Sequence, residues 1–155
     1  MRIHPDLTKL KDARLDEARA GLEASKILLN SGLLKASAFE IVKAWRAYLS
    51  FMAIENRDLV KARIRGFSNV NGYIKVPRVD LLIASMPINM MIAVANILSQ
   101  VDPGLVEVSA MVPLARNYYC SGKCSSCRGT IPDDSSVKVI LVKLITELER
   151  RLQGV

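Results

Sequence analysis

Apolar residues recur every three or four positions along most of this chain, and that spacing predicts helices. The first helix should begin near Pro5 or Asp6, where proline and an acidic side chain suit the opening turn. Its buried face comprises Leu15, Ala18, Leu22, Ser25 and Leu29. The helix should stop at Asn30 to Gly32, because glycine readily takes the left-handed conformation that ends helices.

A second helix with the same spacing follows at once. Its apolar face comprises Leu34, Ala38, Ile41, Trp45, Tyr48 and Met52. The connection around Gly32 is so short that the first two helices must lie antiparallel. Trp45 and Tyr48 then belong to the core or to a dimer face.

The stretch from Leu81 to Val101 carries no charge and is long enough to cross a bilayer. Pro87 interrupts it near its middle, and Asn89, Asn96 and Gln100 would be costly in lipid. We therefore expect a buried central helix, broken at Pro87, and no membrane span.

Two more helices complete the pattern. One should begin at Asp102 and Pro103, bend at Pro113 and reach Tyr119. The last should carry Val137, Leu141, Leu144, Leu148 and Leu152 on one face, with Arg150 and Arg151 at its C-terminal end. Residues 1–155 are thus expected to form one all-α domain, an up-and-down bundle of about five helices.

Composition agrees with a helical protein of the cytoplasm. Only 5% of the 155 residues are aromatic, and half are hydrophobic, which favours packed helices over aromatic-rich strands. The first twenty residues are charged throughout and lack the apolar centre of a secretory signal or membrane anchor. We therefore expect a cytoplasmic protein.

Positive charge is concentrated in a basic loop at residues 55–78. From Arg57 to Arg78 six basic residues face one acidic residue, Asp58, within a chain of net charge +7. The expected topology would bring this loop, His4 and a Cys-rich loop at 119–134 to one end of the bundle. Candidate nucleic-acid contacts are then Arg57, Arg63, Arg65, Lys75, Arg78, Arg116, Lys123 and Arg128.

Aromatic residues near these cations strengthen that prediction. Phe67, Tyr73, Tyr118 and Tyr119 could stack on bases, so the basic end is a candidate site for single-stranded RNA or a nucleotide. The alternative is that the basic loop only keeps the protein soluble.

All three cysteines, Cys120, Cys124 and Cys127, lie within eight residues. Three thiolates with His4 or Asp133 as a fourth ligand would suit a structural zinc ion. A disulfide from Cys120 to Cys124 or Cys127 is equally consistent with the spacing, and buried free thiols are a third interpretation. The spacing also matches the cluster-binding triad of radical enzymes that use S-adenosylmethionine, but those enzymes need a βα barrel.

The segment "EARAGLEASKILLNSGLLKASAFEIVKAWRAYLSFMA" resembles the archaeal PaREP family and the wider HEPN superfamily. The resemblance covers about the first 55 residues. It depends on the leucine-rich first helix, the Gly32 turn and the pattern of Ala38, Lys43, Ala44 and Ala47 in the second. It implies a helical, often homodimeric domain.

Many HEPN proteins are ribonucleases whose motif is an Arg, a polar residue and, several residues on, a His. Arg116 and Asn117 match the opening, but Ser121, Gly122 and Lys123 occupy the positions where the His would fall. Imidazole is the usual proton-transfer group in such chemistry. We therefore expect a non-catalytic protein that binds RNA, a nucleotide or a protein partner through its basic end.

Two alternatives stay open. The first is a ribonuclease with a degenerate motif, in which Arg116 works with Tyr119 in place of His. The second is a scaffold or antitoxin-like partner of a small nucleotidyltransferase.

Overall fold

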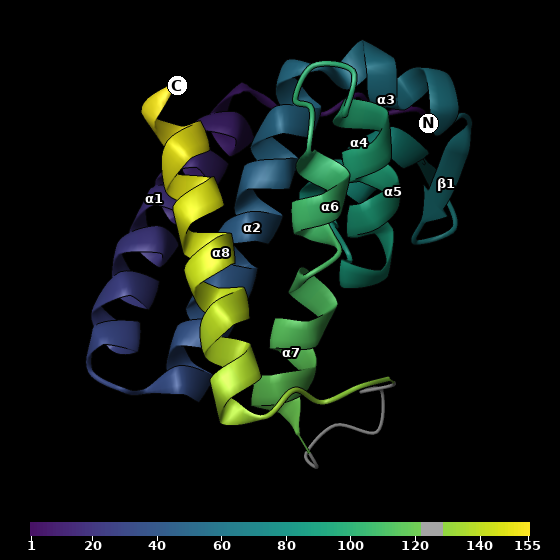
Figure 1. Ribbon diagram of the computed structural model, residues 1–155. Coiled ribbons are helices and arrows are strands. Elements are labelled where there is room, and N and C mark those ends of the chain that lie inside the picture. The colour runs from purple at the N-terminus through teal and green to yellow at the C-terminus, as the bar shows by residue number, and fades with distance from the viewer. Residues whose placement is uncertain (122–128) are drawn as a thin grey trace.

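The chain is mostly helical, as the sequence predicts, with one small β-hairpin. The computed structural model describes residues 1–121 and 129–155. Figure 1 shows long helices packed side by side, with the hairpin and the N-terminus together at one end.

The first two helices form the predicted antiparallel pair. Helix α1 spans Thr8–Asn30 and α2 spans Leu34–Glu55. Gly32, with φ +76°, supplies the left-handed turn between them. Farther up the pair, a Cβ added to Gly21 would lie 2.9 Å from the Ala44 Cβ, so only glycine allows the two backbones this close.

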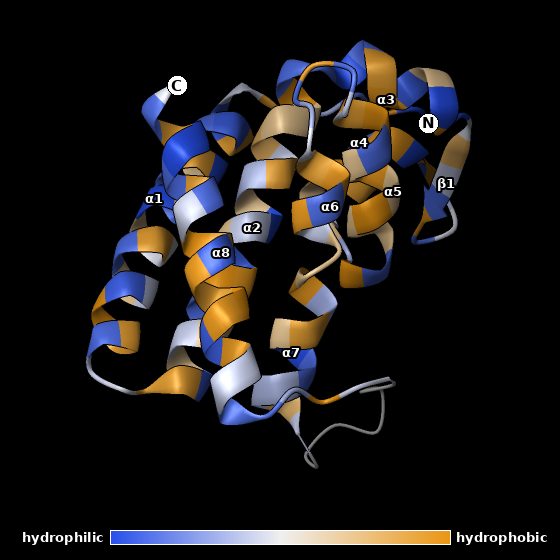
Figure 2. Cartoon of the chain, viewed as in Figure 1, coloured by the Kyte–Doolittle hydropathy of each residue, from blue (hydrophilic) through white to orange (hydrophobic). Residues whose placement is uncertain are grey.

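Helix α2 is the central element of the core. Trp45 is fully buried, and Tyr48 is 3% exposed, which confirms both as core residues. Trp45 Nε1 donates to the carbonyl of Leu144 on the last helix at 3.1 Å, so its polar atom is satisfied inside the core. In Figure 2 α1 and α8 alternate between hydrophilic and hydrophobic residues, as helices with one buried face do.

The C-terminal part of the chain packs against this pair. Helix α6 spans Leu105–Ser109, α7 spans Val112–Cys120 and α8 spans Asp134–Gln153. The predicted fourth helix is therefore two helices, with Pro113 in the first turn of α7. Asp133 caps α8 by accepting a hydrogen bond from the Ser136 amide at 2.7 Å.

The apolar segment is a sharply bent pair of helices instead of one helix. Helix α4 spans Arg78–Ser85 and α5 spans Ile88–Leu98, with an angle of 113° between them. The break at Pro87 is confirmed, and Met86 before it takes the left-handed conformation with φ 35°. Together with the division of α6 from α7, this bend corrects the expected five-helix bundle.

In the described part of the chain, no single helix has the length and apolar character of a membrane span, whereas the bent pair α4 and α5 together meets that criterion.

Two arginines hold the end of α4 in place. Arg14 donates to the carbonyl of Ala84 at 2.8 Å. Arg46 donates to the carbonyls of Ser85 and Met86, each at 3.1 Å. Carbonyls at a helix C-terminus lack helical partners and carry partial negative charge, so these guanidinium groups satisfy and stabilise them.

The basic loop is ordered as a short helix, where the sequence indicates a helical turn or two around Leu59 to Ile64, and a hairpin, which the sequence analysis did not predict. Helix α3 spans Arg57–Arg63, and the antiparallel strands β1 and β2 span Phe67–Val70 and Ile74–Pro77. The tight turn places Asn71 at φ 53° and Gly72 at φ 77°. Both angles are positive in this three-residue turn, in which Asn71, Gly72 and Tyr73 connect the paired residues Val70 and Ile74.

The N-terminal residues 1–5, called the arm below, extend the hairpin by a third strand-like segment. The amide of Ile3 donates to the Lys75 carbonyl at 3.0 Å, and the Lys75 amide donates to the Met1 carbonyl at 2.8 Å. The Met1 amino group also donates to the Tyr73 carbonyl at 3.0 Å. These bonds fix the arm along β2.

Candidate nucleic-acid interface

The cations predicted between Arg57 and Arg78 do lie together, on one end of the molecule. We call this region the basic end: the arm, α3, the hairpin β1–β2 and the first turn of α4 (Figure 1). Its exposed cations are Arg2, Lys61, Arg63, Arg65, Lys75 and Arg78. Tyr73, 86% exposed beside the hairpin turn, adds an unburied aromatic ring.

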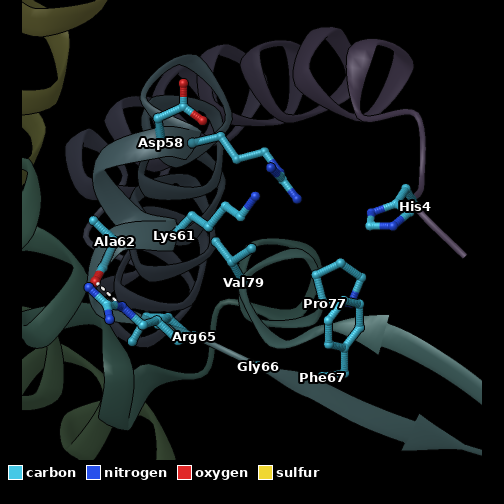
Figure 3. Close-up of a pocket in the computed structure, with 11 residues that line it drawn as sticks. His4, Asp58, Lys61, Ala62, Arg65, Gly66, Phe67, Pro77 and Val79 are labelled. Atoms are coloured by element: carbon cyan, nitrogen blue, oxygen red, sulfur yellow. Dashed lines mark hydrogen bonds between the residues drawn. The ribbon is translucent and has the colours of Figure 1, made fainter. Parts of the chain in front are cut away.

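A pocket of about 360 Å³ lies where the arm, α3 and the hairpin meet. Figure 3 shows its lining side chains, with His4 on the side opposite α3. The cations Arg57 and Lys61 come from α3, while Phe67, Pro77 and Val79 form an apolar floor. One carboxylate, Asp58, also lines the α3 side, so the pocket has more cations than carboxylates on that side and is apolar at its base.

Arg57 is held in place by a buried carboxylate. Its Nε and Nη2 donate to the two carboxylate oxygens of Asp80 at 2.7 and 3.0 Å. Asp80 is only 2% exposed, whereas the Arg57 side chain is 28% exposed. The hydrogen bonds to Asp80 raise the pKa of Arg57 above its usual value. This two-point pair fixes the guanidinium at the pocket edge and links α3 to α4.

Lys61 and Arg65 differ in where they point. Figure 3 shows the Lys61 amine directed into the space between α3 and His4. No hydrogen bond or ion pair joins it to any residue that the structure describes. Arg65 turns the other way, and its Nε donates to the Ala62 carbonyl at 3.1 Å. Lys61 is thus the pocket cation most available to an anion.

Aromatic contacts join the arm to the hairpin. The Arg2 guanidinium lies over the Phe67 ring at 4.7 Å from its centroid. His4 meets the same ring edge to face, at 6.2 Å and an interplanar angle of 82°. Phe67 is therefore the residue against which the arm packs, and the arm in turn forms one wall of the pocket.

Cys120 lies at the opposite end of the molecule from the basic end. The prediction that the basic loop, His4 and the cysteines share one end is therefore wrong for Cys120. Cys120 ends α7, and Tyr118, two residues before it, lines a hollow together with Gly32 at the α1–α2 turn. Helix α1 has 23 residues and separates that turn from the arm by about 35 Å. Hence His4 is wrong as a ligand for a metal held by Cys120.

The bend at Pro87 is the physical reason for this error. The prediction counted the apolar segment as one helix crossing the bundle once. Because α5 turns back at 113° to α4, the chain makes one more reversal than expected. The segments α6 and α7 then run toward the α1–α2 turn instead of toward the basic end (Figure 1).

The metal and disulfide predictions fall mostly outside the described residues. Lys123, Cys124, Cys127 and Arg128 all lie there. Among described residues, no three His, Cys, Asp or Glu side chains are grouped closely enough to hold a metal ion. Zinc, disulfide and free thiols therefore stay predictions.

Asp133, the other proposed zinc ligand, acts as the cap of α8. Its Oδ1 accepts hydrogen bonds from the Ser136 amide and the Ser135 hydroxyl at 2.7 and 3.0 Å. The bond from the Ser136 amide is the main reason that the pKa of Asp133 lies below its usual value. Nearby, burial and then a 2.7 Å hydrogen bond to Asp134 raise the pKa of Tyr118 to about 12.

Arg116 lies on α7 and so is separate from the cations of the basic end. It lines a different, open groove of about 570 Å³ with Asn117 and Arg46. Tyr119 packs edge to face on Phe39, with centroids 5.4 Å apart. The interpretation of Arg116 and Tyr119 as a degenerate ribonuclease pair stays a prediction.

Sequence reasoning missed three features of the basic end. Arg2 and Asp80 were not identified, because neither belongs to a motif and Asp80 lies between the basic loop at 55–78 and the apolar segment that begins at Leu81. The hairpin had a usable signal: Asn71-Gly72 stands between "FSNV" and "YIKV", and that dipeptide favours a tight hairpin turn.

No family model, curated protein or solved structure matched this chain in comparisons of sequence and structure.

Proposed function

We propose that this protein binds single-stranded RNA through the basic end and catalyses no reaction there. The observation that carries this proposal is the concentration of exposed cations on the arm, α3 and the hairpin. Their positive charge has few opposing carboxylates, since Asp80 is buried against Arg57 and Asp58 is the one acidic residue between Arg57 and Arg78.

The chemistry of the surface favours a flexible strand over a rigid duplex. Arg63, Lys75 and Arg78 are exposed and can each approach a phosphate. Tyr73 offers a ring face that is accessible only to an unstacked base. Cations beside an exposed aromatic side chain are the usual composition of a single-strand surface.

The test is RNA affinity as a function of salt. We expect a fluorescent twelve-nucleotide single strand to bind at low salt, and its log association constant to fall linearly with log salt concentration. The double variant Arg63→Glu/Lys75→Glu should bind about a hundredfold more weakly at low salt, because four units of charge change beside the strand. Both side chains are exposed and lie outside the pocket, so folding should be unaffected.

A matched control separates local from overall charge. Arg19 on α1 and Lys138 on α8 are also exposed, and Arg19→Glu/Lys138→Glu changes the net charge equally. This control should retain most of the affinity. The proposal fails if the wild-type protein does not bind at low salt, or if the two double variants bind equally weakly.

We also propose that the α1–α2 pair is HEPN-like, which the tight seam at Gly21 and Ala44 supports. The same resemblance leads us to propose that the protein forms a homodimer and, as an alternative role, recruits a small nucleotidyltransferase. Light scattering of the purified protein gives the oligomeric state, and a monomeric mass at all concentrations would remove the homodimer.

A further inference from the structure

The pocket at the basic end has two chemically different parts, and their proximity is informative. One part is the apolar floor of Phe67, Pro77 and Val79. The other is the pair of α3 cations, Arg57 and Lys61, faced by His4 from the arm (Figure 3). A ligand that uses both parts must carry an apolar plane and an anionic group a few ångströms apart.

We propose that this pocket binds one nucleotide unit, with the base against the apolar floor and the phosphate at Lys61 and Arg57. This inference rests on the proposed function and specifies it further, because the surface outside the pocket requires only phosphates and exposed rings. A volume of about 360 Å³ lies at the small end of the range for ligand pockets and suits a single unit of the strand.

The two simpler ligands fit less well. A bare phosphate would leave the floor of Phe67, Pro77 and Val79 uncovered and so would gain nothing from it. A purely apolar ligand would take water from the Lys61 amine, which has no partner among the described residues, and burying an unpaired charge is costly. A base with its phosphate satisfies both parts.

The site is also organised before the ligand arrives. Asp80 fixes the Arg57 guanidinium with two hydrogen bonds, so little side-chain entropy is lost on binding. The arm is held along β2 by its bonds to Lys75, which keeps His4 at the side facing α3. The pocket therefore keeps its shape without a ligand.

Small probes test the two parts separately. Binding of adenosine 5′-monophosphate, adenosine, ribose 5-phosphate and inorganic phosphate would be measured by calorimetry on the full chain. We expect the monophosphate to bind at least about tenfold more tightly than each of the other three, since only it uses base and phosphate together. If ribose 5-phosphate binds as tightly as the nucleotide, the base part of the proposal is wrong.

A pocket-filling variant tests the location. Ala62 is exposed on α3 and lines the pocket, so Ala62→Trp fills the space without removing a charge or a core contact. We expect at least about a tenfold loss of nucleotide affinity. Ala20→Trp, at an exposed position on α1 outside every pocket described above, is the control and should bind as the wild type does. Equal affinity of the two variants would overturn the proposal.

The nucleotide could be free or part of a strand, and an oligonucleotide series separates these sources. If the pocket holds a unit of the strand, an abasic strand with the same phosphates should bind the wild type about as weakly as normal RNA binds Ala62→Trp. If it holds a free nucleotide, both strands should bind equally, and the monophosphate should bind the pocket without displacing either strand.

The two proposals can fail separately. Failure of RNA binding with nucleotide binding intact would refute the proposed function alone. Loss of nucleotide binding with salt-dependent RNA binding intact would refute this inference alone.

Discussion

Two regions of this protein both contain an arginine paired with carboxylates, but the surroundings of the two arginines differ. At the basic end Arg57 pairs with Asp80, and Lys61, Arg63, Arg65, Lys75 and Arg78 remain exposed around that pair. Under α8, by contrast, Arg151 is 3% exposed and is surrounded by carboxylates. Its Nε donates to Asp102 at 2.9 Å, and its Nη1 donates to the carboxylate and the carbonyl of Glu147.

The buried network extends into the core on both sides. Tyr48 donates its hydroxyl proton to the same Asp102 oxygen at 3.0 Å. The Arg151 guanidinium lies 5.7 Å from the centroid of Trp45. Burial, and then the charge of Asp102, raise the pKa of Tyr48 well above its usual value. The bonds of Asp102 to Arg151 and Tyr48 join α8 and the turn at residue 102 to α2, whereas the pairs of Glu147 lie within α8.

The difference teaches that placement, and not residue type, separates cations that are accessible to a ligand from cations that stabilise the fold. In the network under α8 two carboxylates surround one buried guanidinium, so Arg151 offers no positive charge to a ligand. The basic end is accessible and has an excess of positive charge. Substitutions should therefore separate folding stability from RNA affinity, and the predictions below run from the largest expected effect to the smallest.

The largest effect is expected from Arg151→Ala. Removing this guanidinium leaves Asp102 and Glu147 without their shared cation, and breaking such a buried pair costs about 3–5 kcal/mol. Urea denaturation should show that loss in the free energy of unfolding. The control Arg150→Ala removes the neighbouring, 62% exposed cation and should change stability by no more than about 0.5 kcal/mol.

The folded fraction of Arg151→Ala should still bind RNA as the wild type does, because Arg151 and its partners Asp102 and Glu147 lie outside the basic end. A variant that keeps full stability would show that the network contributes nothing, and the contrast between the two regions would then disappear.

A smaller effect should appear at acidic pH. Hydrogen bonds from Arg151 and then Arg150 lower the pKa of Glu147 from 4.5 to about 2. A carboxylate with a lowered folded-state pKa contributes stability above its unfolded pKa and loses it as pH falls toward the folded value. Stability should therefore decline between about pH 4.5 and pH 2, by at most about 3 kcal/mol from this group.

Denaturation of Glu147→Gln across this range measures that contribution. The variant should be less stable than the wild type at neutral pH and should lose less stability on acidification. Glu107→Gln, an exposed carboxylate on α6, is the control and should leave the acid dependence unchanged. Parallel pH curves for wild type and Glu147→Gln would refute the assignment.

Local periodicity predicted the parts of the fold that depend on one helix face at a time. The α1–α2 pair, the core positions of Trp45 and Tyr48, the break at Pro87 and the final helix all follow from apolar spacing and from Gly and Pro placement. Such signals come from residues within one or two turns of each other, and the sequence contains them in full.

Features that depend on distant residues were not predictable in this way. Proline marks a break but does not give its angle, so the 113° bend and the reversal that it causes were missed. Arg151 carried the same sequence signal as Arg150, yet one is buried and the other exposed, because only the packing of α8 decides which side each faces. For the site, charge density identified the cations between Arg57 and Arg78 that lie together, but it also assigned Arg116 to that end, and the pairing of Arg57 with Asp80 needed the three-dimensional structure.

The smallest effect should come from Gly72→Ala in the hairpin turn. Gly72 has φ +77°, and nothing lies within 4 Å of an added Cβ, so the cost is conformational alone, about 1 kcal/mol. Because the hairpin carries Lys75 and holds the arm, this local strain should raise hydrogen exchange at the Ile3 and Lys75 amides and weaken RNA binding a few-fold. Gly154→Ala is the matched control, since Gly154 has φ −84° and alanine adopts that angle readily. If Gly72→Ala lowers global stability as Arg151→Ala does, the hairpin belongs to the same cooperative unit as the core, and the two regions are not independent.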